Sequence, residues 1–109
     1  MREFLQHQEN LTADFHFKQK QIETGLEQLH YIQTKLHQQI DAIVDYCHYL
    51  HSHSVGLELG TLFPEIESVE QAARQDFRQI ELNLQAGLQR VRQDYRLKSN
   101  RLEENYGHM

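Results

Sequence analysis

Residues 15–50 read FHFKQKQIETGLEQLHYIQTKLHQQIDAIVDYCHYL, a long stretch with a regular apolar pattern. It contains no proline, and an apolar residue returns at every seventh position. The heptad line comprises Phe15, Ile22, Leu29, Leu36, Ile43 and Leu50. Neighbouring apolar positions that widen this line are Leu11, Leu26, Ile32, Ile40, Val44 and Cys47. A heptad pattern of this length keeps one apolar line on one side of an α-helix, so it predicts a helix that packs along other helices.

The composition is that of one domain with a thin core. Of the 109 residues, 39% are hydrophobic and 25% are charged, and the mean hydropathy is −0.75. One proline and five glycines leave little room for a turn-rich β fold. The abundance of Gln, Glu and Leu is typical of long exposed helices. We therefore expect a single all-α domain over residues 1–109.

The sequence predicts a cytoplasmic protein that does not insert into a membrane. No stretch approaches the roughly 18 uninterrupted apolar residues that a transmembrane helix needs. The first residues also lack the apolar stretch and small-residue cleavage site of a secretory signal. The single cysteine, Cys47, has no partner for an internal disulfide and lies on the apolar side of the first helix. It is predicted to be a buried, unreactive thiol.

One stretch near the middle, containing Gly60 and Pro64, is expected to interrupt the helices. Thr61 is the expected N-cap of the second helix, because Pro64 then falls in the first turn, where its missing N–H costs nothing. The alternative start is Ser68, with a weaker capping signal. The predicted elements are a first helix at about 2–52, a connection at about 53–61 and a second helix at about 62–106.

The second half is also amphipathic, with apolar residues mostly three or four positions apart. These are Ile66, Val69, Ala73, Phe77, Ile80, Leu84, Leu88, Val91, Tyr95, Leu102 and Tyr106. The predicted fold is a long antiparallel two-helix hairpin, coiled-coil-like, that completes a helical bundle with a partner. Pairing about residue 58 would bring Gly25 near Val91 and Gly87 near Leu29. The shared level of the two glycines is consistent with a close approach of the backbones, with a bend, or with chance.

A partner is expected because each helix of such a hairpin has only one neighbour, and a core this small seldom supplies more than about 3–5 kcal/mol. The partner is either another copy, giving an antiparallel four-helix bundle, or a different helical protein. The candidate partner-binding residues are Leu29, Leu36, Ile43, Leu50, Phe77, Leu84, Val91, Tyr95, Arg92 and Arg96.

Charge changes sign along the second helix. From Glu58 to Glu81 there are six acids and two arginines, whereas from Arg90 to Arg101 there are five basic residues and one acid. The whole chain carries a net charge of −5, with a pI near 5.9. Nucleic-acid binding usually requires a basic footprint over the whole domain, so it is not expected. The charge blocks instead predict a solvated face that selects the partner and its register.

The eight histidines and the acids form no recognisable catalytic or metal-binding motif. His48, His51 and His53 lie close together at the end of the first helix, but zinc needs three or four converging ligands. Contact between partly protonated imidazoles and the carboxyl end of that helix is the favoured interpretation, and a metal- or pH-responsive regulator is the alternative. No metal, cofactor or enzymatic activity is expected.

An acidic chain of this length, with two long helices and a break at Val55-Gly56-Leu57-Glu58-Leu59-Gly60, resembles the WXG-type helical hairpins of type VII secretion. More narrowly, it is similar to the small targeting factors encoded beside LXG toxins in Gram-positive bacteria. The resemblance covers nearly the whole chain in architecture, although the chain has no tryptophan and so lacks the WXG turn itself. It implies a non-enzymatic, chaperone-like factor that packs along the helical N-terminal domain of the toxin and presents it for secretion.

The export signals of that family pair an aromatic residue with an acid four positions later, near the C-terminus. Here Phe63 with Glu67 and Phe77 with Glu81 fit the spacing, but both pairs lie well before the tail. The resemblance therefore implies the factor without the export motif, working beside a second small helical factor. Such a factor is cytoplasmic, or is exported together with the toxin.

Overall fold

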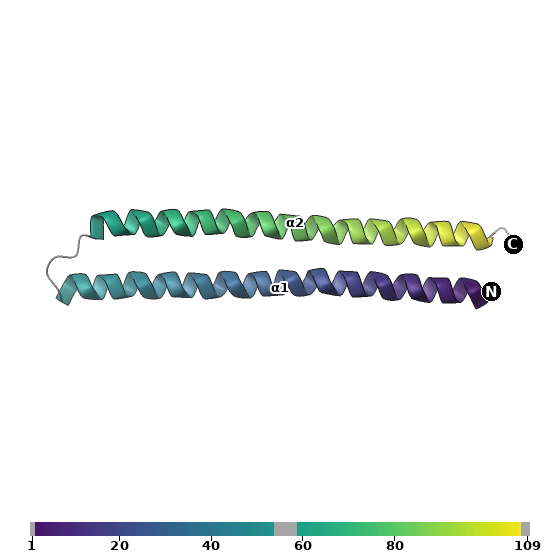
Figure 1. Ribbon diagram of the computed structural model, residues 1–109, viewed down its shortest axis with the longest axis horizontal. Helices are drawn as coiled ribbons and strands as arrows, with labels where there is room; N and C mark the ends of the chain where they lie inside the picture. Colours follow the sequence, from purple (N-terminus) through teal and green to yellow (C-terminus); the bar gives the residue numbers. More distant parts are fainter. Residues whose placement is uncertain (1, 54–58, 108–109) are drawn as a thin grey trace. The chain divides into compact units, whose positions relative to one another are not determined.

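The computed structural model describes residues 2–53 and 59–107, and all of these are helical. The first helix, α1, spans Arg2–His53 and the second, α2, spans Leu59–Gly107 (Figure 1). The prediction of an all-α protein with two helices is therefore confirmed. Most of the predicted connection, residues 54–58, lies outside the described residues.

The helices form two compact units, each built from a segment of α1 and a segment of α2. Unit 1 consists of Met1–Glu27 and Leu82–Met109, and unit 2 consists of Gln28–Glu81. Within each unit the two helical segments lie side by side and run in opposite directions (Figure 1). This is the predicted antiparallel hairpin. The grouping of residues 1–109 into a single domain stays a prediction.

The inward face of α1 contains five of the six predicted heptad residues, Phe15, Ile22, Leu29, Leu36 and Leu50, and it also shows an 11-residue spacing. Leu11, Ile22 and Val44 lie on this spacing and are half-buried, and Leu29 and Ile40, also 11 residues apart, are buried. An 11-residue repeat corresponds to about 3.67 residues per turn, close to the 3.6 of a straight α-helix.

The heptad prediction is wrong at Ile43, whose side chain is 51% exposed. Ile40 is buried and Val44 is half-buried on the inward face near this level. Leu50, one heptad after Ile43, is half-buried again, so the heptad line fails at this one position.

The apolar stripe of α2 follows the same spacing. Its half-buried members include Leu62, Ala73, Leu84, Tyr95 and Tyr106, each 11 residues from the next. Val69 and Ile80 were predicted in this stripe, but both are exposed. Each lies to one side of the inward line, as Ile43 does on α1.

The second helix starts earlier than the sequence predicted. Because α2 begins at Leu59, Thr61 lies inside the helix, so its prediction as the N-cap is wrong, and so is the alternative start at Ser68. Pro64 also lies inside the helix. A proline there cannot donate a hydrogen bond to the carbonyl of Gly60, so the first turn of α2 holds fewer intrahelical bonds than a regular one.

Gly25 and Gly87 lie at a similar height along the helices of unit 1, as predicted. Their neighbours on the other helix differ from the predicted Val91 and Leu29. A Cβ atom added to Gly25 would lie 3.7 Å from Leu84, and one added to Gly87 would lie 3.7 Å from Ile22. Both neighbours are one heptad away from the predicted ones, because the pairing is centred nearer residue 55 than residue 58. A separation of 3.7 Å is an ordinary van der Waals contact, so neither glycine is required by a close approach of the backbones.

The core is small. Among the described residues only Leu29, Ile40 and Cys47 are buried, and all three lie on the unit 2 segment of α1. The predicted burial of the Cys47 thiol is confirmed. None of the described helices is long and apolar enough to cross a membrane.

Candidate helix-docking surface

One cross-helix contact identifies one side of unit 2. The His37 imidazole Nδ1 lies 3.7 Å from a Glu70 carboxylate oxygen, which joins α1 to α2. Glu70 also accepts a hydrogen bond of 2.6 Å from Arg74, and His37 lies 3.5 Å from Asp41. A shallow cavity of about 200 Å³ on this side is lined by His37, Glu70 and Arg74 together with apolar residues of both helices. This side of unit 2 is therefore polar.

Four exposed aliphatic residues occur in unit 2 at a regular interval. Ile32 and Ile43 lie 11 residues apart on α1, and Val69 and Ile80 lie 11 residues apart on α2. Their side chains are 51%, 51%, 65% and 45% exposed, respectively. We call these four residues the aliphatic quartet. The inward residues Leu29 and Ile40 are also 11 residues apart. Both members of each quartet pair are therefore rotated by about the same angle from the inward stripe of their helix.

Helical geometry places the aliphatic quartet on the side of unit 2 opposite to the polar one. At 3.6 residues per turn, Ile43 is rotated by roughly 120° from His37 about the axis of α1. Val69 is rotated by roughly 100° from Glu70 about the axis of α2. His37 and Glu70 meet on one side of the helix pair. On each helix the quartet residues lie across the inward stripe from His37 or Glu70. The quartet residues of both helices therefore lie on the opposite side of the helix pair.

The register of unit 2 brings the four residues together. His37 approaches Glu70, and the His48 ring lies 5.0 Å from the Phe63 ring. On this register Ile32 and Ile80 lie within about one helical turn of the same level, as do Ile43 and Val69. The quartet is therefore a two-layer apolar patch that spans both helices. Apolar surface grouped in this way is typical of protein-binding sites, whereas single exposed apolar residues are ordinary.

Charged and aromatic groups border the aliphatic quartet. The ammonium of Lys35 lies 5.6 Å from the centre of the Tyr31 ring on α1. The Tyr46 and Tyr49 rings stack 6.5 Å apart, and Tyr49 stacks on His53 at 4.3 Å. On α2 the nearest charges are acidic, at Glu65 and Asp76. By helical geometry Lys35 and Tyr46 lie at the border of the quartet on α1, whereas Tyr31 and Tyr49 are rotated by roughly 100–120° from it. The border thus contains a basic residue along α1 and acidic residues along α2.

Unit 1 is joined mainly by aromatic contacts across the helices. The Phe15 and Tyr95 rings stack 4.3 Å apart, and the Phe4 and Tyr106 rings lie 5.3 Å apart. The Thr12 and Tyr95 hydroxyls share a hydrogen bond of 3.2 Å. The four exposed large apolar residues of this unit are Leu5, Phe17, Leu82 and Leu97. By helical geometry they point in different directions and form no counterpart of the quartet.

A surface of alternating charges covers one side of unit 1. Lys18 pairs with Asp14 at 3.0 Å, and Lys98 pairs with Asp94 at 2.9 Å. Asp14, Lys18 and Asp94 line the same small cavity between the helices. The hydrogen bond from Lys18 to Asp14 and the negative charge of Asp14 raise the pKa of Lys18 above its usual value, although partial desolvation opposes the change.

Most of the predicted partner-binding residues help to pack α1 against α2. Leu29 is buried and Ile43 is exposed. The half-buried members of the predicted set are Leu36, Leu50, Phe77, Leu84, Val91 and Tyr95. The predicted set does not contain the exposed residues Ile32, Val69 and Ile80, although their 11-residue interval was a signal that could have grouped them.

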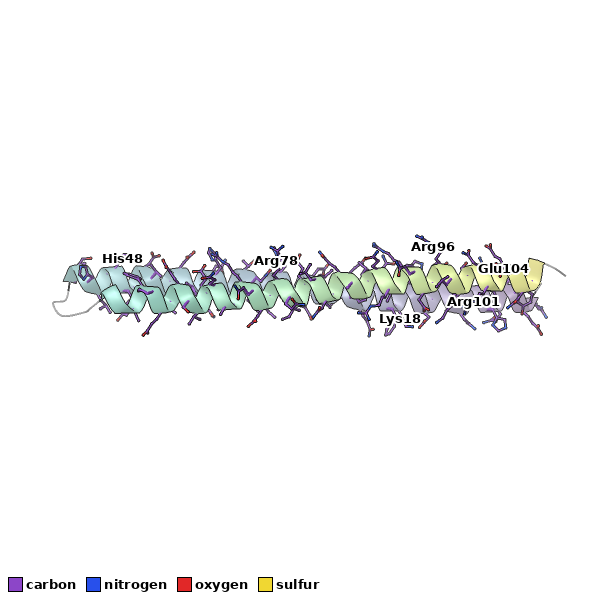
Figure 2. The ribbon with its side chains drawn as sticks, turned by 90° about the horizontal axis from the view of Figure 1, so that it is seen from above. Lys18, His48, Arg78, Arg96, Arg101 and Glu104 are labelled. Carbon is purple, nitrogen blue, oxygen red and sulfur yellow. The ribbon has the colours of Figure 1, made fainter. Side chains whose placement is uncertain are left out.

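The predicted arginines lie in unit 1, and both are exposed. Figure 2 shows Arg96 projecting from the edge of unit 1 opposite to Lys18. Neither arginine borders the aliphatic quartet, which belongs to unit 2. Their predicted effect on the orientation of a partner stays a prediction.

The clustered histidines have local partners. The Nδ1 atom of His53 lies 3.0 Å from the Tyr49 carbonyl oxygen, and His48 is next to Phe63. These contacts agree with the interpretation of His53 as a residue at the carboxyl end of α1. Within residues 2–53 and 59–107, no group of three or more His, Cys, Asp or Glu residues is placed to hold a metal ion.

Comparisons with protein-family models, with curated proteins and with solved structures found no match to this chain. The candidate surface therefore depends on the residues of this chain alone.

Proposed function

We propose that this protein is a non-enzymatic binding factor whose unit 2 receives the helices of a larger protein on the aliphatic quartet. One observation carries the proposal: four large aliphatic side chains on one side of unit 2 are 45–65% exposed although they repeat at the interval of the core. Covering them with apolar helices would gain about 25 cal/mol for each Å² removed from water.

The specific form that we propose is a targeting factor for an LXG toxin in type VII secretion. The antiparallel two-helix fold, the acidic chain and the exposed apolar side support it. In this role the factor packs along the helical N-terminal domain of the toxin in the cytoplasm, beside a second small helical factor. It either stays there or leaves the cell with the toxin.

Co-expression with the N-terminal domain of an LXG toxin encoded beside this gene tests the proposal. We expect a complex that co-purifies, with the mass of both chains by light scattering and a higher melting temperature than the free chain. Ile43→Glu should abolish the complex, because it places a charge at the centre of an apolar contact. Leu97→Glu is the matched control, because Leu97 is equally exposed but lies in unit 1.

Failure of the wild-type chain to bind that domain would reject the targeting role. Equal loss of binding in both variants would show that the quartet is not the docking surface. Charge reversal at Arg92 and Arg96 should slow assembly without unfolding unit 1, because exposed charges act mainly on the association rate.

A homo-oligomeric scaffold is the second candidate function. The observation that favours it is the internal symmetry of the quartet, with one aliphatic pair on each helix at the same interval.

A further inference from the structure

We infer that a second copy of this chain covers the aliphatic quartet when no other partner is bound, and that the two copies form a two-fold dimer through unit 2. The inference goes beyond the proposed function, since it does not require a toxin. It rests on the symmetry of the patch and on the charges at its border.

The arrangement of the quartet is self-complementary. A two-fold interface uses the same patch on both copies, so every residue of the patch must find a suitable residue of the same patch opposite to it. A two-fold axis parallel to the helices of unit 2 sets α1 of one copy against α2 of the other. The helices then run antiparallel, at the register that unit 2 already uses.

At that register the aliphatic layers match. Ile32 lies within about one turn of Ile80 of the other copy, and Ile43 within about one turn of Val69 of the other copy. All four residues are aliphatic and β-branched, so each layer meets a layer of the same chemistry and similar volume. The result is an antiparallel four-helix arrangement around eight side chains.

The border charges are complementary in the same arrangement. Lys35 borders the quartet on α1, and Asp76 borders it on α2. Along the helix axes, Lys35 of one copy lies within about one helical turn of Asp76 of the other copy. Two-fold symmetry repeats this contact, so the dimer contains it twice. Among the described residues neither side chain is in an ion pair within the chain, and the Lys35 ammonium lies near the Tyr31 ring, at 5.6 Å.

Sedimentation equilibrium of the full chain tests the dimer. Over roughly 1–200 µM the wild-type chain should pass from monomer to dimer. Ile43→Glu should raise the dimer Kd by at least about tenfold, because each interface contains the residue twice. Leu97→Glu should leave the Kd unchanged, and circular dichroism should show equal helix content in all three proteins. A wild-type chain that stays monomeric would overturn the inference.

A charge swap separates a second copy from any other occupant. Lys35→Glu alone and Asp76→Lys alone should each weaken the dimer by about 3- to 10-fold, because each creates two like-charge contacts. The double variant should recover the wild-type Kd, because the pair is restored with its signs exchanged. A double variant as weak as the product of the two single variants would overturn the arrangement.

The dimer and the proposed function can fail separately. A monomer that binds the toxin domain through Ile43 would overturn the dimer and leave the proposed function in place. A dimer that obeys the charge swap but ignores the toxin domain would support the inference and reject the targeting role.

Discussion

Units 1 and 2 are built from the same two helices, yet they use their apolar residues differently. In unit 1 the large aromatic residues meet across the helices, as Phe15 and Tyr95 do at 4.3 Å. Unit 2 contains all three buried residues, and it also exposes the aliphatic quartet. Both units leave large apolar side chains exposed, but unit 2 groups four of them, the aliphatic quartet, on one side of the helix pair.

The difference lies in how the exposed apolar residues are grouped. By helical geometry, the exposed apolar residues of unit 1 point in different directions. The aliphatic quartet of unit 2 lies on one side of its helix pair. Exposed apolar residues that are grouped in this way are typical of protein-binding surfaces, whereas scattered ones are ordinary.

The largest expected effect is the loss of the unit 2 core. Leu29→Asp should lower the free energy of unfolding by about 3 kcal/mol or more, because it buries a carboxylate without a partner. Gln38→Asp, at an exposed position of the same helix segment, is the control and should change it little. Thermal unfolding followed by circular dichroism measures both. Equal melting temperatures would mean that the inward face of α1 is wrongly assigned.

A smaller effect should follow from breaking an aromatic contact of unit 1. Tyr95→Ala should cost about 2 kcal/mol, since it removes a half-buried ring stacked on Phe15. Tyr95→Phe keeps the ring and should cost about 0.5–1 kcal/mol through the hydrogen bond to Thr12. Urea unfolding separates the two. If Tyr46→Ala in unit 2 cost as much as Tyr95→Ala, the contrast between the units would not hold.

The two mid-helix glycines should tolerate alanine. Gly25→Ala and Gly87→Ala should each stabilise unit 1 by about 1 kcal/mol, because alanine has the higher helix propensity and the new Cβ atom meets its neighbour at an ordinary distance. The melting temperature should rise in both variants and rise further in the double variant. A fall would show that the helices of unit 1 approach more closely than the structure indicates.

The smallest expected effect concerns Lys18. Its pKa is raised by Asp14 in the folded chain, so the ion pair stabilises the fold at pH values below the usual lysine pKa of 10.5. That contribution is lost as the pH rises through the higher folded value. The melting temperature of Lys18→Met should therefore be slightly lower than that of wild type at neutral pH, and the two should converge above pH 10.5.

Much of the fold, but less of the surface, could be predicted from the sequence. The helix content and the buried Cys47 follow from apolar periodicity, which is a local signal. The start of α2 could not be predicted, because Gly60, Thr61 and Pro64 are common signals of a helix boundary and the helix here contains all three. The candidate partner-binding residues were mainly inward ones, because heptad periodicity does not distinguish a residue facing α2 from one facing outwards.

The two amphipathic helices follow from the sequence alone, because apolar residues three or four positions apart are a local signal. The register and the outward face follow from the packing of the two helices. Apolar spacing marks a face of a helix, but it does not show which residues at the edge of that face contact the neighbouring helix. Packing against α2 covers Ile40 and Val44 and leaves Ile43 exposed, on the same side as Ile32, Val69 and Ile80.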